Sequence, residues 1–183
     1  SRIDLMKDMK KQINFKGVSD NLLSADVHEP RGEVHGNPVL LLHGGGQTRH
    51  AWGGAARRIA DAGHMAFTLD QRGHGDSAWV DDKSYAFDDY AADAVAVCRE
   101  IADMTGKKAV LVGASLGGIS GLMAEYLGGP RLLAGLVLVD ITPHMDADGV
   151  SRIQGFMAER MREGFATLEE AADAIAAYLP HRA

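Results

Sequence analysis

The sequence predicts an α/β protein built on a mostly parallel sheet. Short apolar runs without polar alternation occur at 39–42, 65–69, 109–112 and 133–139. Such runs are typical of strands covered on both faces, which is the environment of a parallel sheet. Helix-like stretches separate the runs, and strand–helix alternation with right-handed crossovers gives a three-layer arrangement with helices over both faces of the sheet.

Before these runs the chain shows the pattern of an antiparallel hairpin. Apolar and polar residues alternate over 13–15 and over 23–27, with the polar residues 19–21 between them. Alternation with a period of two indicates a strand with one buried face, and a short polar turn joins antiparallel neighbours. We therefore expect two half-buried strands ahead of the parallel part of the sheet.

Helices are predicted between the parallel strands, over 51–62, 87–102 and 116–127. The second of these has the clearest pattern, because its apolar residues form one stripe at helical spacing. Asp88 and Asp89 lie in its first turn, where carboxylates stabilise the positive end of the helix dipole.

The pattern changes after Pro143. Two helix-like stretches follow without a strand between them, and the second begins with the capping box 167–170. We expect residues 1–143 to form the core of the fold and residues 144–183 to form a helical lid inserted over the sheet.

Composition excludes several classes of function. Of the 183 residues, 46% are hydrophobic and 24% charged, and the formal net charge is −6. A net negative chain has no general attraction for nucleic acid or anionic lipid, and no apolar run approaches the roughly 20 residues that cross a bilayer. The single cysteine, Cys98, excludes an internal disulfide and fits a reducing compartment. We expect a cytoplasmic protein that binds neither nucleic acid nor membranes.

The sharpest chemical signal is the segment 113–117 (Gly-Ala-Ser-Leu-Gly), between a predicted strand and a predicted helix. Glycines at both ends permit a turn too tight for larger side chains, so that Ser115 is exposed at the positive end of the helix. This is the G-x-S-x-G nucleophile elbow in its required strand–turn–helix setting. A serine hydroxyl there becomes an effective nucleophile only with a base nearby.

A dinucleotide-binding loop is the alternative interpretation of the same segment, since it too joins a strand to a helix through glycines. Asp140, at the end of the next strand, would suit a ribose. However, G-x-G-x-x-G requires glycine where the pyrophosphate approaches, and Ser115 stands there. The sequence therefore favours a nucleophile.

A second glycine-rich segment, 43–46 (His-Gly-Gly-Gly), follows the strand predicted at 39–42. Acyl transfer develops negative charge on a carbonyl oxygen, which unobstructed backbone N–H groups stabilise. Loops of the HGGG type supply one donor, and the residue after the nucleophile supplies the other. We expect the amides of Gly45 and Leu116 to be these donors, with Gly44 beside them. By itself the glycine run would indicate only a tight connection between strand and helix.

With the segment 70–77 (Asp-Gln-Arg-Gly-His-Gly-Asp-Ser), these motifs make the chain resemble the α/β-hydrolase family, in particular its serine esterase and peroxidase-like members. The resemblance covers roughly residues 12–145. It implies a Ser–acid–His triad, a lid after the sixth strand, and a structural role for 70–77. Ser115 argues against the dehalogenases and epoxide hydrolases of this fold, which use aspartate. His74 and Asp76 lack companions at metal-ligand spacing, so we expect no metal and no cofactor.

The same resemblance places the acid and the histidine of the triad after the last two strands of the family's sheet, and this sequence contains neither strand. Some family members carry their acid where Asp140 stands; the alternative is a carboxylate that caps loop amides. None of the 8 histidines occupies the family's base position. We therefore expect the chain to be the N-terminal part of a longer hydrolase, with the catalytic histidine beyond Ala183.

The expected reaction is cleavage of a carboxylic ester through an acyl-enzyme intermediate on Ser115. Met145, Met157 and Met161 suggest an adaptable apolar pocket wall, hence a small-molecule ester with a small or medium apolar acyl group. A thioesterase, a C–C hydrolase or a cofactor-free perhydrolase would use the same residues, and a non-catalytic ligand-binding receptor is the alternative from another class. If the strand at 133–139 forms an open edge, we expect pairing with a second copy of the chain.

Overall fold

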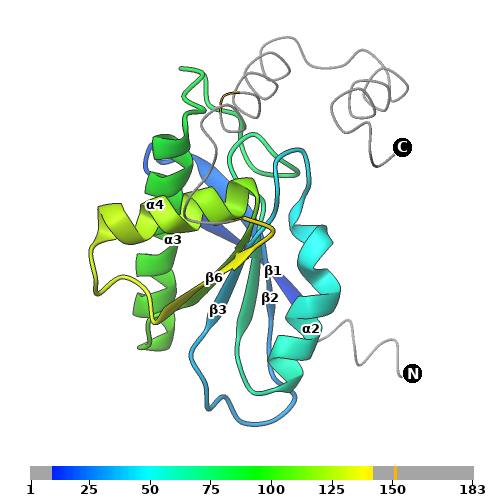
Figure 1. Ribbon diagram of the computed structural model, residues 1–183. Coiled ribbons are helices and arrows are strands. Elements are labelled where there is room, and N and C mark those ends of the chain that lie inside the picture. The colour runs from blue at the N-terminus through cyan, green and yellow to red at the C-terminus, as the bar shows by residue number, and fades with distance from the viewer. Residues whose placement is uncertain (1–9, 142–150, 152–183) are drawn as a thin grey trace. The chain divides into compact units, whose positions relative to one another are not determined.

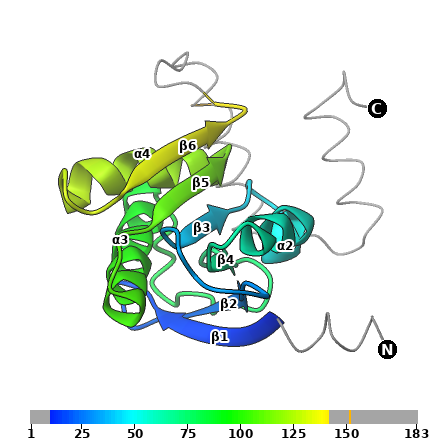
Figure 2. The ribbon, with the colours of Figure 1, turned by 90° about the horizontal axis from the view of Figure 1, so that it is seen from below.

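The computed structural model describes residues 10–141 and Ser151. Figure 1 shows its sheet, whose strand order β1-β2-β4-β3-β5-β6 can be followed by the labels in Figure 2. The strands are β1 (Lys10–Lys16), β2 (Leu22–His28), β3 (Val39–Leu42), β4 (Ala66–Leu69), β5 (Val110–Ala114) and β6 (Gly135–Val139). Strands β3 to β6 are parallel to their neighbours among themselves, while β2 is antiparallel to both β1 and β4. The predicted hairpin and parallel sheet are therefore confirmed.

The predicted helices are confirmed as well, with small changes in their bounds. They are η1 (Arg49–Trp52, a 3₁₀ turn), α2 (Gly53–Asp61), α3 (Phe87–Thr105) and α4 (Leu116–Gly128). The helix expected over 51–62 is thus divided into η1 and α2, and α3 continues to Gly106, whose left-handed φ of 70° ends it. Figure 2 shows α3 and α4 on one face of the sheet and α2 on the other.

The chain divides into two compact units, Ser1–Pro143 and His144–Ala183. The helices expected after Pro143 lie outside the described residues. In the part of the chain that the structure describes, no helix has both the length and the apolar character needed to span a membrane.

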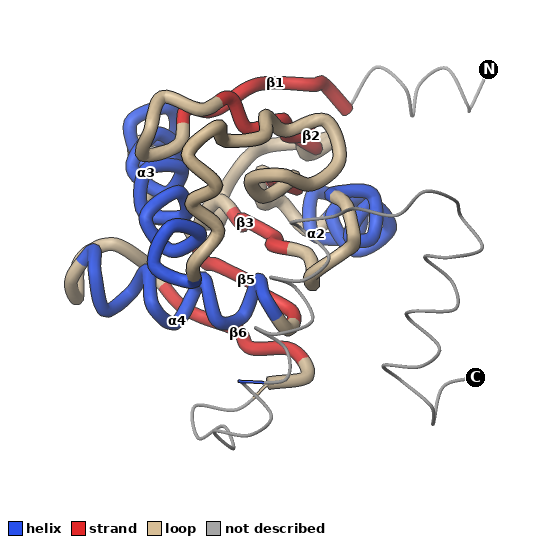
Figure 3. The backbone as a smooth tube through the Cα atoms, turned by 90° about the horizontal axis from the view of Figure 1, so that it is seen from above, coloured by secondary structure: helices blue, strands red, loops and turns tan. Residues whose placement is uncertain are grey.

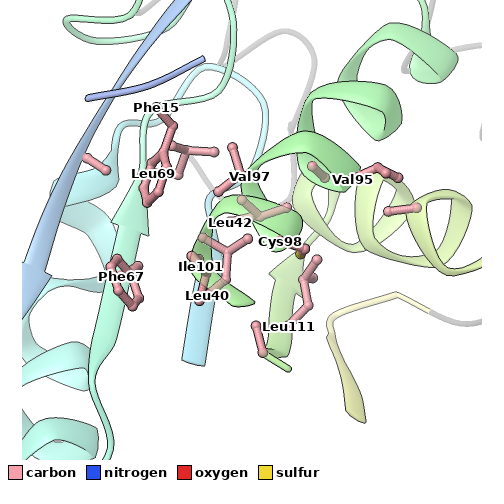
Figure 4. Packing of buried hydrophobic residues seen from close by; sticks show 14 of the residues in the cluster. Phe15, Leu40, Leu42, Phe67, Leu69, Val95, Val97, Cys98, Ile101 and Leu111 are labelled. Atoms are coloured by element: carbon pink, nitrogen blue, oxygen red, sulfur yellow. The ribbon is translucent and has the colours of Figure 1, made fainter. Parts of the chain in front are cut away.

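Strand β3 illustrates why the apolar runs do not alternate. Leu40 and Leu42 belong to the cluster on the α3 side of the sheet, where Figure 4 shows them beside Cys98 and Ile101. Val39 and Leu41 instead belong to the cluster on the α2 side. Both faces of β3 are covered and all four of its residues are buried and apolar, and burying each large side chain contributes roughly 1.5–3 kcal/mol.

Strand β2 differs from the expectation of a half-buried strand. Its polar residues Ser24, Asp26 and His28 are buried, as are the apolar residues between them. The reason is that β2 lies between β1 and β4, and polar side chains from later in the chain, such as Ser77 and Arg49, cover its polar face. The Ser24 amide, for example, donates to Ser77 Oγ at 2.8 Å. The half-buried description holds for β1, in which only Phe15 is buried.

Strand β6 is less covered than its apolar sequence predicts. Val137 and Val139 are 47% and 38% exposed. In the described sheet β6 is the outermost strand and pairs only with β5, which accounts for the exposure. Pairing of this edge with a second copy stays a prediction.

The segment 70–77 is fixed to the helix layer by a buried ion pair. Arg72 Nε lies 2.7 Å from Asp93 Oδ2, and its Nη2 lies 2.8 Å from Asp93 Oδ1, so the two side chains pair through two parallel hydrogen bonds. The remaining Arg72 nitrogen donates to Ser84 O at 2.6 Å. Asp93 belongs to α3 and also accepts the Val18 amide at 3.0 Å. One ion pair therefore joins α3, the segment 70–77 and the β1–β2 turn.

Replacing Arg72 by methionine should cost about 3–5 kcal/mol in the free energy of unfolding, because Asp93 is then left buried without its cation. Lys11→Met is the matched control: Lys11 pairs with Glu29 at 3.2 Å on the surface, and such pairs contribute less than about 1 kcal/mol. Urea unfolding of the two variants measures the difference. Equal losses would contradict a structural role for the buried pair.

Candidate active site

Ser115 lies between β5 and α4 in a strained turn. Its φ is 50° and its ψ −114°, a conformation that non-glycine residues rarely adopt and that costs about 1–3 kcal/mol. A Cβ on Gly113 would lie 2.2 Å from Gly117 O, and a Cβ on Gly117 would lie 2.2 Å from Leu42 O. Both glycines are therefore required by the tightness of the turn, as the sequence predicts. The half-buried Ser115 stands directly before the first residue of α4.

The loop 43–46 lies against this turn. A Cβ built on Gly44 would be 3.6 Å from Ser115 Cβ. The Gly44 amide donates to Gln47 Oε1 and the Gly46 amide to His74 Nε2, each at 3.0 Å.

The amides of Gly45 and Leu116 differ from those two neighbours. Within residues 10–141, neither amide has a hydrogen-bond acceptor. Leu116 opens α4, so its N–H belongs to the positive end of the helix dipole. The loop and the turn, which meet where Gly44 approaches Ser115, thus carry two amide donors that have no partner among the described residues.

His43 is fully buried and holds the glycine loop in place. Its Nε2 accepts the Gln71 amide at 3.0 Å, so the ring proton must be on Nδ1, which lies 2.7 Å from Gly44 O and donates to it. Burial lowers the pKa of His43 from its ordinary 6.5 to about 4. His43 is therefore neutral and fixed in one tautomer, in agreement with the loop-stabilising role expected from the sequence.

His74 stabilises the other end of the loop, at Gly46, in the same way. Its Nδ1 lies 2.9 Å from Arg72 O, and its Nε2 accepts the Gly46 amide. Burial lowers the pKa of His74, and its ring centroid lies 5.0 Å from that of His43. The sequence analysis gave the segment 70–77 a structural role and weighed His74 as a metal ligand, but it did not identify this contact with the glycine loop. Among residues 10–141 and 151, no three His, Cys, Asp or Glu side chains are grouped to hold a metal ion.

Arg49, which the sequence analysis did not single out, anchors the far side of the loop. Its guanidinium is buried and pairs with Asp70 through Nη1, with Asp76 at 2.8 Å through the same nitrogen, and with Asp26 at 3.2 Å through Nε. The Arg49 amide also donates to Asp70 Oδ1 at 2.6 Å. Burial alone would lower the pKa of Arg49, but hydrogen bonds to Asp76 and Asp70 raise it well above its usual value.

Asp140 is at the same edge of the sheet as Ser115. Ala114 of β5 pairs with Val139 of β6, so Ser115 and Asp140 are the next residues along two neighbouring parallel strands. Figure 3 shows β3, β5 and β6 side by side at this edge. Asp140 is exposed and, like Ser115, has a positive φ, here 56°. The topology thus brings together the two candidate catalytic side chains that the sequence named.

The remaining described histidines are dispersed. His28 is buried in β2, and His50 in η1 lies 4.0 Å from Asp26. His35 and His64 pack beside one another ahead of β3 and β4, at the amino-terminal edge of the parallel strands. His144 and His181 lie outside the described residues.

The model of the alpha/beta hydrolase fold family matches residues 37–174. The chain belongs to the α/β-hydrolase family. The resemblance identified from the motifs is thereby confirmed, and so is the fold class.

Individual relatives agree with this assignment. Esterase Rv0045c of Mycobacterium tuberculosis (strain ATCC 25618 / H37Rv) is 35% identical over 149 residues, covering 79% of this chain and 47% of the relative. A putative carbamate hydrolase, RutD of Variovorax paradoxus (strain S110), is 38% identical over 114 residues, covering 62% of this chain and 41% of the relative. The chain spans about half the length of the curated relatives it matches.

Solved structures show the same fold. The crystal structure of an alpha/beta hydrolase from Novosphingobium aromaticivorans DSM 12444 matches with a TM-score of 0.66 and 26% identity, over 80% of this chain and 50% of the other.

Acid should destabilise the fold through His43. The unfolded chain binds a proton near pH 6.5 and the folded protein only near pH 4, so the free energy of unfolding falls as the pH drops through this range. For His43 the loss reaches on the order of 3 kcal/mol. Urea unfolding at a series of pH values measures it.

His43→Gln is the control for this prediction. Glutamine keeps an oxygen that can accept the Gln71 amide but has no titratable group, so the variant should lose less stability between pH 6.5 and 4. An identical pH dependence in both proteins would show that His43 is not responsible.

Proposed function

We propose that the protein carrying this chain is a serine hydrolase that cleaves carboxylic esters through an acyl-enzyme intermediate. The observation that carries the proposal is the placement of Ser115 in a strained turn before α4, against a glycine loop whose Gly45 amide has no acceptor within residues 10–141. A nucleophile elbow and an oxyanion hole require these two features to be adjacent. The similarity to an esterase supports the same reaction class.

The reaction begins with attack of Ser115 Oγ on the ester carbonyl carbon. The carbonyl π electrons move to oxygen, and the amides of Gly45 and Leu116 donate hydrogen bonds to the oxyanion that forms. Collapse of this intermediate expels the alcohol and leaves an acyl group on Ser115, and water then repeats the attack to release the acid. The proton from Ser115 passes to a base and from the base to the leaving alcohol.

His43 and His74 do not serve as that base. Each uses Nε2 as an acceptor for a backbone amide and Nδ1 as a donor to a backbone carbonyl, so neither has a nitrogen left to take the Ser115 proton. We assign the base to another histidine of the protein, and assign to Asp140 the carboxylate that orients it. The register beside Ser115 and the exposed position of Asp140 support this assignment.

A carbamate is the second candidate substrate. The putative carbamate hydrolase is the more identical of the two relatives described above, although over a shorter segment. Carbamates offer the same carbonyl carbon to Ser115 and the same developing oxyanion to the amides. Comparing kcat/KM for a p-nitrophenyl ester and the matching p-nitrophenyl carbamate separates the two substrate classes.

Ser115→Ala should abolish both ester hydrolysis and covalent labelling by a fluorophosphonate, because the probe reacts only with an activated serine. Mass spectrometry of the labelled protein identifies the modified residue. Ser19→Ala, in an exposed turn, is the matched control and should label normally. A wild-type protein that neither labels nor hydrolyses esters would favour the ligand-binding receptor.

Asp140→Asn should lower kcat by roughly 10³–10⁴-fold, the loss expected when the group orienting a catalytic histidine no longer carries the negative charge that fixes the tautomer and stabilises the imidazolium. Asp20→Asn controls for backbone conformation and charge, since Asp20 is also exposed and has a φ of 57°. Steady-state kinetics of both variants gives the comparison. If kcat stays within threefold of the wild type, Asp140 caps loop amides instead.

A further inference from the structure

Gln71 is a buried residue with no place in the reaction described above. It follows Asp70 at the end of β4 and is 4% exposed. Its amide donates to His43 Nε2 at 3.0 Å, and its side-chain Nε2 donates to His43 O at 2.8 Å. Gln71 therefore holds both the ring and the backbone of His43, the first residue of the glycine loop, by hydrogen bonds.

The oxygen of the Gln71 side-chain amide, Oε1, faces Ser120 of α4. Ser120 Oγ lies 3.0 Å from Gln71 Oε1 and 2.8 Å from Leu116 O, and Ser120 is fully buried. Its single proton is shared between these two acceptors. The Leu116 carbonyl belongs to the same residue whose amide we assign to the oxyanion hole, so the bridge through Gln71 and Ser120 ends on the residue that carries the second donor.

The orientation of the Gln71 amide is determined by its neighbours. A backbone carbonyl can only accept, so the side-chain NH₂ must face His43 O and the oxygen must face Ser120. One side chain thus links two segments that lie 28 and 49 residues away along the chain.

We propose that Gln71, acting through Ser120, is a positioning residue that sets the relative placement of the Gly45 and Leu116 amides. This inference rests on the proposed function and adds a residue that touches neither substrate nor reacting atoms. Oxyanion donors act only within about 2.7–3.1 Å of the developing charge. A displacement of about 1 Å at a reacting centre can lower the rate on the order of 10²-fold.

The close contact of Gly117 with Leu42 keeps the two segments together without Gln71. Because a Cβ at Gly117 would already lie 2.2 Å from Leu42 O, the backbones touch independently of the side-chain bridge. Loss of the bridge should therefore alter the fine placement of the amides more than the assembly of the fold.

The test compares Gln71→Met, which keeps the side-chain length and the backbone amide but loses the side-chain hydrogen bonds to His43 O and Ser120 Oγ, with the exposed control Gln12→Met in β1. For each full-length variant we would measure kcat and KM on a p-nitrophenyl ester, and the inhibition constant of phenylboronic acid. The boronate forms a tetrahedral adduct on serine that places an oxygen in the oxyanion hole. Gln71→Met should lower kcat by roughly 10–100-fold with KM within about twofold.

The boronate separates positioning from general structural damage. If Gln71 positions the donors, the inhibition constant rises in parallel with the fall in kcat, while Gln12→Met changes neither. Ser120→Ala should show the same pattern with a smaller loss. It also provides the test should Gln71→Met fail to fold.

Two outcomes would overturn the inference. The first is that kcat and boronate affinity are unchanged in Gln71→Met or, if that variant does not fold, in Ser120→Ala. The second is that KM rises by the same factor as kcat falls, with no selective loss of boronate affinity. In both cases the wild-type protein still hydrolyses the ester, so the proposed function stands. If the wild type itself neither hydrolyses the ester nor labels at Ser115, the proposed function and this inference fail together.

Discussion

The contact on which the site depends is the close approach of α4 to the end of β3. Gly117 lies so near the backbone of Leu42 that any residue with a Cβ at position 117 would collide with it. Because Leu42 pairs with Gly113 in the register of β3 and β5, the turn at Ser115 and the glycine loop emerge from neighbouring strands at one level. The strand register alone therefore brings together two segments that lie some seventy residues apart in the sequence. The parallel register and a single glycine place the serine beside the loop.

Behind this contact, polar groups are buried and satisfy one another. Leaving a buried polar group without a hydrogen bond costs about 1–3 kcal/mol, so each member of such a network is constrained by the others. His43 and His74 accept backbone amides, and Gln71 bridges to Ser120. Arg49 supplies positive charge among the carboxylates of the segment 70–77. A network of this kind makes the glycine loop rigid, which glycines alone could not do.

Local patterns predicted the fold well because they arise from local physics. Unalternating apolar runs gave the parallel strands, and the turn at Ser115 is dictated by glycines within two residues. Strand β2 was misjudged because Ser24, Asp26 and His28 look like a solvent-facing row, whereas partners from later in the chain cover them. The roles of His74, Gln71 and Arg49 were missed for the same reason. The partners that define these roles are Gly46 for His74, Asp70 for Arg49 and Ser120 for Gln71. They lie between 21 and 49 residues away, and only the strand order β2-β4-β3-β5 brings them together.

The neutral state of the two loop histidines also links stability to the proposed catalysis. Protonation would turn the Nε2 of His43 and His74 from an acceptor into a donor, directed at the Gln71 and Gly46 amides that now donate to them. Two donors cannot share a hydrogen bond, so protonation of either ring would force the loop to move. The acidic limb of the activity profile should therefore contain a contribution from the scaffold in addition to the titration of the catalytic base. A base that titrates alone gives a simple one-proton limb, whereas loop and base together give a steeper one.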